Sequence, residues 1–404
     1  MAEPLRRFIV NRYRERHVPV ALVLPDGERV PLSPTPEFDL IVRTWSGLRA
    51  IATPEMGALA RAYVRDQIDF TGSARRALAI ADAMVGDIAH GRDRWLTRAR
   101  LWLHQHRSNR ANIRHHYDVS DAFYRLWLDE RMIYSCAYFR TAEDTLDEAQ
   151  AQKLDHICRK LRLAPGERFL DIGCGWGALI LWAAERYGVE ATGITLSQNQ
   201  LDHVTRQIAE RGLTGRVHVE LRDYLDLPDT PQYDKVASIG MVEHVGVRRL
   251  PGYFRKIIGV LKPGGFVLNH GITHNPLGAD SLGSGIGDFV DEYVFPGGEL
   301  AHVSRVIEAM GAAGLELVDA EALREHYART LWHWVSRLEA NAPAARAEVG
   351  EEKYRVWRIY MAGSAHAFDA GWLSLWQLLA GKPLQEGRLP HPLTRDYMYG
   401  NPPT

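Results

Sequence analysis

From about residue 165 onward, short apolar runs alternate with longer stretches in which apolar residues recur at helical spacing. The short runs have the length and composition of buried strands, and Gly or Pro punctuates the segments between them. Such alternation indicates parallel strands joined by crossover helices, so we expect a doubly wound, Rossmann-like α/β core. The expected strands are 168–172, 189–195, 217–221, 233–239 and 266–270, and the expected helices are 178–187, 197–212 and 249–260.

The first 110 residues follow a different pattern, with two apolar runs followed by two Ala-rich stretches at helical spacing. The expected elements are strands within 18–25 and 38–43, a turn at 25–27, and helices within 54–66 and 73–90. This pattern predicts a smaller α+β domain over 1–105, which would serve dimerisation or membrane docking. The catalytic domain would then cover 106–404.

Two further segments are expected as additions to the core. Residues 276–298 are rich in glycine, which predicts a loop or lid. Residues 327–379 are rich in aromatic residues and are expected to form a helical tail.

Charge and cysteine content narrow the class of protein. The 404 residues include 49 basic and 50 acidic side chains, which does not indicate a general attraction to nucleic acid. Cys136, Cys158 and Cys174 form no C-x-x-C pair, which argues for a reducing compartment and against disulfides or a structural zinc site. No apolar run approaches the length of a membrane span or of a signal peptide after the arginines of residues 1–20, so a cytoplasmic protein is expected.

One local stretch, residues 92–110, combines six arginines with Trp95 and Trp102. Basic residues interleaved with tryptophan suit the surface of an anionic bilayer. The same composition also fits a solvated helix face whose aromatic residues pack on a neighbour. Both interpretations stay open at this point.

The turn after the first expected core strand is rich in glycine. Its sequence is Asp171-Ile172-Gly173-Cys174-Gly175-Trp176-Gly177, and it leads directly into a helix. A glycine-rich turn between a strand and a helix is typical of nucleotide-type sites, because glycine lets the backbone approach a ligand closely. We therefore expect Gly173, Gly175 and Gly177 to bind a cofactor.

Polar side chains at the ends of the first three strands refine the identity of this cofactor. Asp171 would repel a pyrophosphate but can hold the cationic amino group of a methionine moiety, although Asp also caps turns. Thr195 to Gln200 follow the second strand and offer hydroxyls and amides for a ribose, with Gln200 the main candidate. Asp223 can accept from an adenine amine, and Tyr224 can stack on the ring. This set favours S-adenosylmethionine over a dinucleotide.

The sequence resembles class I S-adenosylmethionine-dependent methyltransferases and, more closely, the cyclopropane fatty acid and mycolic acid cyclopropane synthase family. The segments that carry the resemblance are 112–119, 134–139, 170–177, 193–200, 238–246, 326–331 and 360–363. The resemblance runs from about residue 108 to about residue 380, and the added N-terminal region resembles the longer, phospholipid-acting bacterial branch of the family.

The resemblance implies an activity and a set of site residues. A methylene would pass from S-adenosylmethionine to cis-unsaturated acyl chains of membrane phospholipids, at the inner face of the membrane, with bound bicarbonate as the base. The implied bicarbonate ligands are Cys136 and Ile272 through their backbone, together with Glu243, His270 and Tyr327. The implied cofactor-binding residues also include Tyr134, Ser135, Thr195 and Leu196.

These residue types suit that chemistry. His270 and Tyr327 can donate hydrogen bonds to an oxyanion, and Glu243 can accept one from a protonated oxygen. Taken singly, Glu243 also fits a helix first turn, His270 a paired core histidine and Tyr327 simple packing. Cys136 has no neighbouring base in the sequence, so a positional role is expected rather than a nucleophilic one.

Two departures from the family pattern leave the shape of the acyl pocket open. Gly271 stands where better-known members have a bulkier residue, and Ser364 stands where mycolate-acting members often have Cys. Three alternatives to a cyclopropane product stay open as well. They are a methyl-branched or methylene-bearing acyl product, methylation of a small amine or hydroxyl compound, and a non-enzymatic lipid-binding protein. A homodimer is a further expectation.

Overall fold

The computed structural model describes residues 2–14, 18–52, 55–85, 119–275, 285–294 and 299–399. The chain divides into two compact units. Unit 1 comprises Met1–Trp127, Ala279–Gly297 and Leu331–Ala367, and unit 2 comprises Leu128–Gly278, Gly298–Thr330 and Phe368–Thr404. The predicted domain boundary near residue 105 lies outside the described residues and stays a prediction.

Unit 2 is built on a seven-stranded sheet with the order β10-β11-β9-β8-β5-β6-β7. The strands are β5 (Arg168–Ile172), β6 (Glu190–Thr195), β7 (Val217–Leu221), β8 (Tyr233–Ile239), β9 (Leu261–His274), β10 (Glu316–Ala322) and β11 (Leu373–Gly381). The five strands predicted from the sequence are parallel neighbours in this sheet. The predicted doubly wound core is therefore confirmed, and β9 is longer than predicted at both ends.

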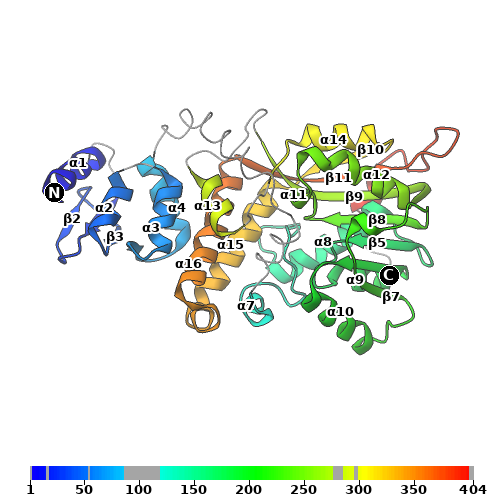
Figure 1. Cartoon of the computed structure of the whole chain (residues 1–404), viewed down its shortest axis with the longest axis horizontal. Helices are drawn as coiled ribbons and strands as arrows, with labels where there is room; N and C mark the ends of the chain where they lie inside the picture. The colour runs from blue at the N-terminus through cyan, green and yellow to red at the C-terminus, as the bar shows by residue number, and fades with distance from the viewer. Residues whose placement is uncertain are drawn as a thin grey trace. The chain divides into compact units, whose positions relative to one another are not determined.

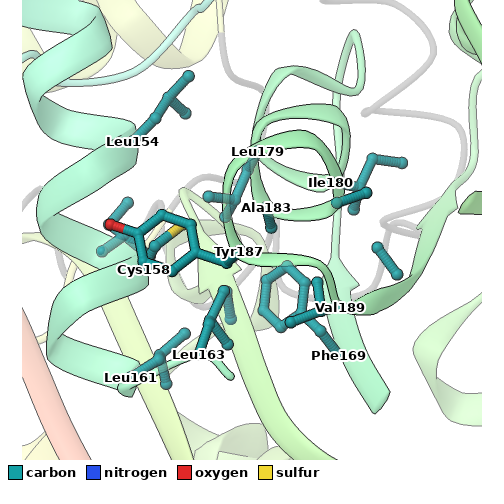
Figure 2. Packing of buried hydrophobic residues seen from close by; sticks show 14 of the residues in the cluster. Leu154, Cys158, Leu161, Leu163, Phe169, Leu179, Ile180, Ala183, Tyr187 and Val189 are labelled. Atoms are coloured by element: carbon teal, nitrogen blue, oxygen red, sulfur yellow. The ribbon is translucent and has the colours of Figure 1, made fainter. Parts of the chain in front are cut away.

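Helices cover both faces of this sheet (Figure 1). They are α8 (Leu146–Leu161), α9 (Ala178–Tyr187), α10 (Gln198–Glu210), α12 (Leu250–Val260) and α14 (Val303–Ala312). Buried side chains of α8, α9 and α10 form one apolar layer, and those of α12 and α14 form a second layer. Figure 2 shows the first layer, where Phe169 of β5 lies among Leu163, Ala183 and Tyr187. Alternate residues of each strand enter the two layers, which fixes the faces to which site residues point.

The predicted helical tail is wrong at its end, because β11 is a strand. It pairs antiparallel with β9 on one side and with β10 on the other. Its sequence Leu373-Ser-Leu-Trp-Gln-Leu-Leu-Ala380 is almost continuously apolar and nearly all of it is buried. A strand buried on both faces has no two-residue alternation, so its sequence cannot be distinguished from a buried helix by periodicity.

Unit 1 contains a four-stranded sheet with the order β2-β1-β3-β4. Its elements are α1 (Ala2–Arg14), β1 (Val20–Val23), β2 (Arg29–Pro31), β3 (Phe38–Val42), α2 (Trp45–Ala52), α3 (Met56–Val64), β4 (Ile68–Phe70) and α4 (Ala74–Val85). The predicted α+β character of this region is confirmed. The two three-residue strands and the helices α1 and α2 were not predicted.

The long helix α16 (Ala342–Asp369) also belongs to unit 1 up to Ala367, although it lies within the range 106–404 predicted for the catalytic domain. The reason is a pair of buried arginines on α16. Arg355 donates to the carbonyl oxygen of Tyr63 at 2.9 Å and to Asp69 Oδ2 at 2.8 Å. Arg358 donates to the Tyr63 hydroxyl at 2.9 Å and to the Gly72 carbonyl oxygen at 2.8 Å. These bonds fasten α16 to α3 and β4.

The glycine-rich segment is not purely a loop, because Ile286–Tyr293 forms helix α13 in unit 1. This helix packs on α3. A Cβ added to Gly57 would lie 2.1 Å from the carbonyl oxygen of Gly285, so the contact requires glycine at position 57. Residues 276–284 and 295–298 lie outside the described residues, as do the basic stretch 92–110 and the motif residues 112–118.

The remaining elements are short, apart from α15. They are α7 (Asp121–Arg125), η2 (Tyr224–Asp226), α11 (Val242–Val245), η3 (Val247–Arg249), α15 (Arg324–Ala340) and α17 (Asp396–Tyr399). Within the part of the chain that the structure describes, no helix combines the length and apolar character needed to cross a membrane.

Candidate active site

The glycine-rich turn lies between β5 and α9, at the carboxyl end of the parallel strands. The backbone N–H groups of Gly173 and Cys174 both donate to the carbonyl oxygen of Ile194, at 3.0 Å each. Gly173 and Gly177 have φ values of +82° and +83°, which only glycine adopts readily. The turn is thereby held against the neighbouring strand β6.

Space around the turn differs from one glycine to the next. A Cβ on Gly173 would lie 2.7 Å from the Met241 side chain, and one on Gly177 would lie 2.8 Å from Val204. A Cβ on Gly175 would have no heavy atom within 4 Å. Gly173 and Gly177 therefore serve close packing, and Gly175 is the position where a ligand can approach the backbone.

Asp171, the penultimate residue of β5, is buried, and its Oδ1 has no hydrogen-bond partner among the described residues. Burial raises the pKa of this carboxyl to about 7, and the nearby Lys153 opposes that rise. A shielded carboxyl oxygen without a donor is suited to a cationic ammonium group. The predicted role of Asp171 in holding a methionine amino group fits this arrangement and stays a prediction.

Gln150 and Lys153 of α8, which were not predicted as site residues, hold the segment that contains Tyr134 and Ser135. Gln150 Nε2 donates to the carbonyl oxygen of Ser135 at 2.9 Å, and Lys153 Nζ donates to Ser135 Oγ at 3.0 Å. Burial lowers the pKa of Lys153 to about 8, against the pull of Asp129. Polar residues three positions apart on an otherwise apolar helix face were the signal that could have identified them.

The predicted ribose-binding residues follow β6. Thr195 Oγ1 donates to Gln200 Oε1 at 2.7 Å, and Ser197 caps α10 by accepting from the Gln200 backbone. The carbonyl end of the Gln200 side chain is thus engaged, which leaves its NH2 end as the group that would donate to a ligand. Leu196 is half-buried in the same connection. Gln200 remains the predicted ribose ligand, whereas the Thr195 hydroxyl orients it.

Asp223 and Tyr224 have structural partners. Asp223 Oδ1 accepts from the Leu225 backbone at 3.0 Å and caps the short helix η2. The Tyr224 ring packs edge-on against Tyr253, with 5.2 Å between ring centroids. The predicted contacts of both residues with adenine stay predictions.

Glu243 lies on α11, directly after β8. Its Oε1 accepts from the Ile272 backbone N–H at 2.7 Å, while Oε2 is shielded from solvent and has no partner among the described residues. Burial raises the pKa of Glu243 to about 7, more strongly than the Ile272 hydrogen bond lowers it. Ile272 was predicted to bind an anion through its backbone. Its N–H positions the carboxyl group of Glu243, and its contact with an anion stays a prediction.

His270 is buried on β9, level with Ile239 at the end of β8. Its Nδ1 lies 3.2 Å from Gln377 Nε2, and its Nε2 has no partner among the described residues. Burial, together with the positive charges of Lys153 and Lys160, holds the pKa of His270 well below its usual range. The imidazole is therefore neutral at physiological pH.

Cys136 and Tyr327 come together at the carbonyl oxygen of Leu323. Cys136 Sγ lies 3.9 Å from this oxygen, and the Tyr327 backbone N–H donates to it at 3.0 Å. Burial raises the pKa of the Cys136 thiol far above neutrality, which argues against a thiolate nucleophile. The Tyr327 ring is half-buried, with its centroid 4.8 Å from that of Phe368.

The motif 134–139 is tied to the start of α15 by two further hydrogen bonds. The Ala137 backbone donates to Thr330 Oγ1 at 3.0 Å, and the Phe139 backbone donates to His326 Nδ1 at 3.1 Å. Two motifs almost 190 residues apart in the sequence are thereby brought together.

Gly271, one of the departures from the family pattern, is explained by Val242. A Cβ on Gly271 would lie 2.2 Å from Val242 Cγ1 and 3.7 Å from Glu243 Oε1. Val242 therefore occupies the space that a larger residue 271 would need. His244, on the same helix, was not predicted as a site residue; burial lowers its pKa to about 4.

No group of His, Cys, Asp and Glu residues suited to a metal ion occurs in residues 119–275 or in the other described ranges. The site is instead a set of buried organic donors and acceptors. Asp171 and the glycine turn lie at the carboxyl end of β5, and Glu243 and His270 lie at the carboxyl ends of β8 and β9.

Comparison with known proteins gives a consistent result. The family model for mycolic acid cyclopropane synthetase matches residues 104–378. A Pseudomonas putida protein described as a probable fatty acid methyltransferase is 43% identical over 383 residues, which cover 95% of this chain and 97% of that protein. Cyclopropane mycolic acid synthase 1 of Mycobacterium tuberculosis is 37% identical over 282 residues, covering 67% of this chain and 97% of that protein.

Among solved structures, the mycolic acid cyclopropane synthase CmaA1 in complex with SAH and CTAB is 36% identical, with a TM-score of 0.64. The match covers 69% of this chain and all of that one. The cyclopropane synthase MmaA2 from Mycobacterium tuberculosis matches with the same TM-score and 34% identity. The chain therefore belongs to the mycolic acid cyclopropane synthetase family and is an S-adenosylmethionine-dependent methyltransferase.

Proposed function

We propose that this methyltransferase transfers a methylene group to the cis double bond of unsaturated acyl chains in membrane phospholipids, forming a cyclopropane ring. The observation that carries the proposal is a pair of buried atoms, Glu243 Oε2 and His270 Nε2, without partners among the described residues. Buried polar atoms nearly always have a hydrogen-bond partner. Two such atoms without partners therefore indicate that a polar ligand binds there together with the substrate.

An alkene acceptor explains why the site needs such a pair. An alkene is a weak nucleophile and carries no acidic proton, so a proton must leave only after the new carbon–carbon bond has formed. The residues that face this step must avoid quenching a cationic carbon, which disfavours exposed charge and water. His270 is neutral, and the raised pKa of Glu243 limits the charge on that carboxyl.

A bicarbonate ion fits the donors and acceptors of this pocket, and it would supply the base that removes the proton. His270 Nε2 and the Tyr327 hydroxyl would donate to its oxygens, and Glu243 Oε2 would accept from its hydroxyl group. The Cys136 backbone N–H would be a further donor. The Ile272 N–H holds Glu243 Oε1 in place.

S-adenosylmethionine supplies the electrophilic methyl group. Asp171 would hold its amino group, the backbone at Gly175 would contact it closely, and Gln200 would bind the ribose. Lys153 and Gln150 would act through the Ser135 segment, which they fasten to α8.

A second product is kept as the alternative: a methyl-branched or methylene-bearing acyl chain. Two observations favour keeping it. Gly271, a departure from the family pattern, lies beside Glu243, and Val242 occupies the space that a larger residue there would need. The Pseudomonas putida relative is also described as a fatty acid methyltransferase rather than as a cyclopropane synthase.

The test is a product assay with the full-length protein. The protein is incubated with methyl-labelled S-adenosylmethionine and vesicles of a phospholipid with cis-unsaturated acyl chains. The lipid is then analysed by mass spectrometry and proton NMR. We expect label in the acyl chain, a gain of one CH2 unit, and the strongly shielded proton signals of a cyclopropane ring.

Vesicles with the same headgroup but saturated chains are the matched control and should take up no label. A methyl doublet or new olefinic signals in place of ring signals would select the alternative product. If no lipid is labelled while the protein still binds S-adenosylmethionine, the proposed lipid substrate is wrong.

A further inference from the structure

Three polar side chains form a row across the sheet of unit 2. His270 on β9 is directly opposite Gln377 on β11, and Gln377 is directly opposite Glu321 on β10. Leu268 and Leu379, each two residues from a member of this row, belong to the layer packed by α8. Because side chains alternate between faces, the row lies on the α8 side of the sheet.

The middle residue, Gln377, is completely buried. Its Nε2 lies 3.2 Å from His270 Nδ1. A neutral imidazole has one N–H and one bare nitrogen, and the partner of one nitrogen decides which is which. An amide NH2 can only donate, so Nδ1 must be the bare nitrogen of this pair.

The far side of the row, beyond Gln377, carries charges of both signs. Lys160 Nζ lies 2.6 Å from Glu321 Oε2 and 3.2 Å from Asp319 Oδ2. The amide oxygen, Gln377 Oε1, is buried and has no partner among the described residues, whereas the NH2 group is engaged with His270 Nδ1. Lys153 and Lys160 also disfavour a second proton on His270, so the imidazole stays neutral and its tautomer matters.

We propose that Gln377 is a positioning residue that holds neutral His270 in the tautomer with its proton on Nε2. The buried Nε2–H is then a hydrogen-bond donor with no partner among the described residues, and it lies on β9, the strand on which the Ile272 N–H holds Glu243 two residues further on. The catalytic consequence rests on the proposed function, because an anion in that pocket needs a donor there. The opposite tautomer would present a lone pair to an anion and would repel it.

The first measurement uses the ligand-free, full-length wild-type protein labelled with 15N-histidine. Long-range proton–nitrogen NMR spectra distinguish a protonated from a bare ring nitrogen, and the His270→Gln spectrum identifies the His270 signals. We expect a bare Nδ1 and a protonated Nε2. A protonated Nδ1 in the wild type overturns the proposal whatever the activity of the protein.

The variants test whether Gln377 causes this state. Gln377→Leu removes the donor at similar volume and should let His270 populate both tautomers. Gln377→Glu places an acceptor opposite Nδ1 and should move the proton there. Activity on lipid should fall by about tenfold to a hundredfold in both, as it does when a metal-ligating histidine loses the partner that orients its ring.

Ser374→Ala is the matched control. Ser374 is buried on the same strand, and its separation of three residues from Gln377 directs it to the opposite face. This variant should change neither the tautomer nor the activity. If Gln377→Leu does not fold, Gln377→Glu and the wild-type spectrum still decide the question.

The outcomes separate the two proposals. If Gln377→Leu keeps both the Nε2–H tautomer and full activity, the positioning role is wrong. If the tautomer depends on Gln377 as expected but the wild type modifies no lipid, the positioning role stands and the proposed function is wrong.

Discussion

Two buried polar clusters in this chain differ in how completely their groups are satisfied. In unit 1, Arg355 is 6% exposed and all three of its guanidinium nitrogens have acceptors, on Glu351, Tyr63 and Asp69. In unit 2, Glu243 and His270 each have one atom engaged and one shielded atom without a partner among the described residues.

The difference shows what each cluster does. A buried ion pair with every hydrogen bond made costs little to maintain and fastens two segments together. A half-satisfied pair is unfavourable in the free protein and gains its partners only when a ligand arrives. The unit 1 cluster is therefore structural, whereas the Glu243–His270 pair has hydrogen bonds unmade among the described residues, which the proposed function assigns to a bound anion.

The largest expected effect is a loss of activity on substitution of Glu243, which tests whether this residue has a functional or only a structural role. Glu243→Gln removes the ionisable oxygen but keeps the shape, so activity on unsaturated phospholipid should fall by about 10²- to 10⁴-fold. The measurement is kcat/KM with the labelled-lipid assay, alongside calorimetric binding of S-adenosylmethionine, which should not change. Unchanged activity would assign Glu243 a purely structural role.

The same variant should alter the dependence of stability on pH. The folded-state pKa of Glu243 is raised from 4.5 to about 7, so the folded protein binds more protons than the unfolded chain between these values. The free energy of unfolding of the ligand-free protein should therefore decline as pH rises from 4.5 to 7. Glu243→Gln should remove a decline on the order of 2 to 3 kcal/mol, measured by urea unfolding.

In the satisfied cluster, Arg355→Met should act on stability. It removes the charged hydrogen bonds to Tyr63 and Asp69, while Asp69 keeps its ion pair with Arg43, so the free energy of unfolding of unit 1 should fall by about 1.5 to 3 kcal/mol. Binding of S-adenosylmethionine per folded molecule should not change.

The matched control is Arg305→Ala, which breaks an ion pair with Glu308. The Arg305 side chain is 64% exposed and the Glu308 side chain is 67% exposed. It should cost less than about 1 kcal/mol. Equal losses from the two arginine variants in denaturant titrations would contradict the structural role of Arg355.

Packing beside Glu243 gives a third test. Gly271→Ala brings a Cβ to 2.2 Å from Val242 Cγ1, and overpacking of this kind costs about 1 to 3 kcal/mol. Adding Val242→Ala should restore much of the lost stability, because it removes the clashing methyl groups. Thermal unfolding of the two single variants and the double variant measures this coupling, and strict additivity would exclude it.

The smallest expected effect concerns the cofactor side. Asp171→Asn should weaken binding of S-adenosylmethionine about tenfold at pH 8, or 1.4 kcal/mol. Since burial raises the Asp171 pKa to about 7, wild-type affinity should rise with pH through 7, and the difference from the variant should shrink at pH 6. Calorimetry at the two pH values checks this; Asp202→Asn, an exposed acid on α10, is the control.

Much of the fold of unit 2 follows from local sequence signals. The strands from β5 to β8 and the helix α9 match their predicted ranges closely, because short apolar runs bounded by Gly or Pro and helical periodicities depend on near neighbours alone. The glycine turn and Asp171 were predicted for the same reason, because the whole motif lies within the seven residues 171–177. β11 was misassigned because a strand buried on both faces carries no alternation.

The sequence by itself determined the doubly wound core, the glycine turn and, through its motifs, the residues Glu243, His270 and Tyr327. Only the tertiary structure decided which atoms of these residues are already engaged. The hydrogen bond by which the Ile272 N–H holds Glu243 was not predicted, nor was the contact between His270 and Gln377, 107 residues away. Such pairings depend on strand register and burial, which arise from contacts between distant segments and leave no local trace in the sequence.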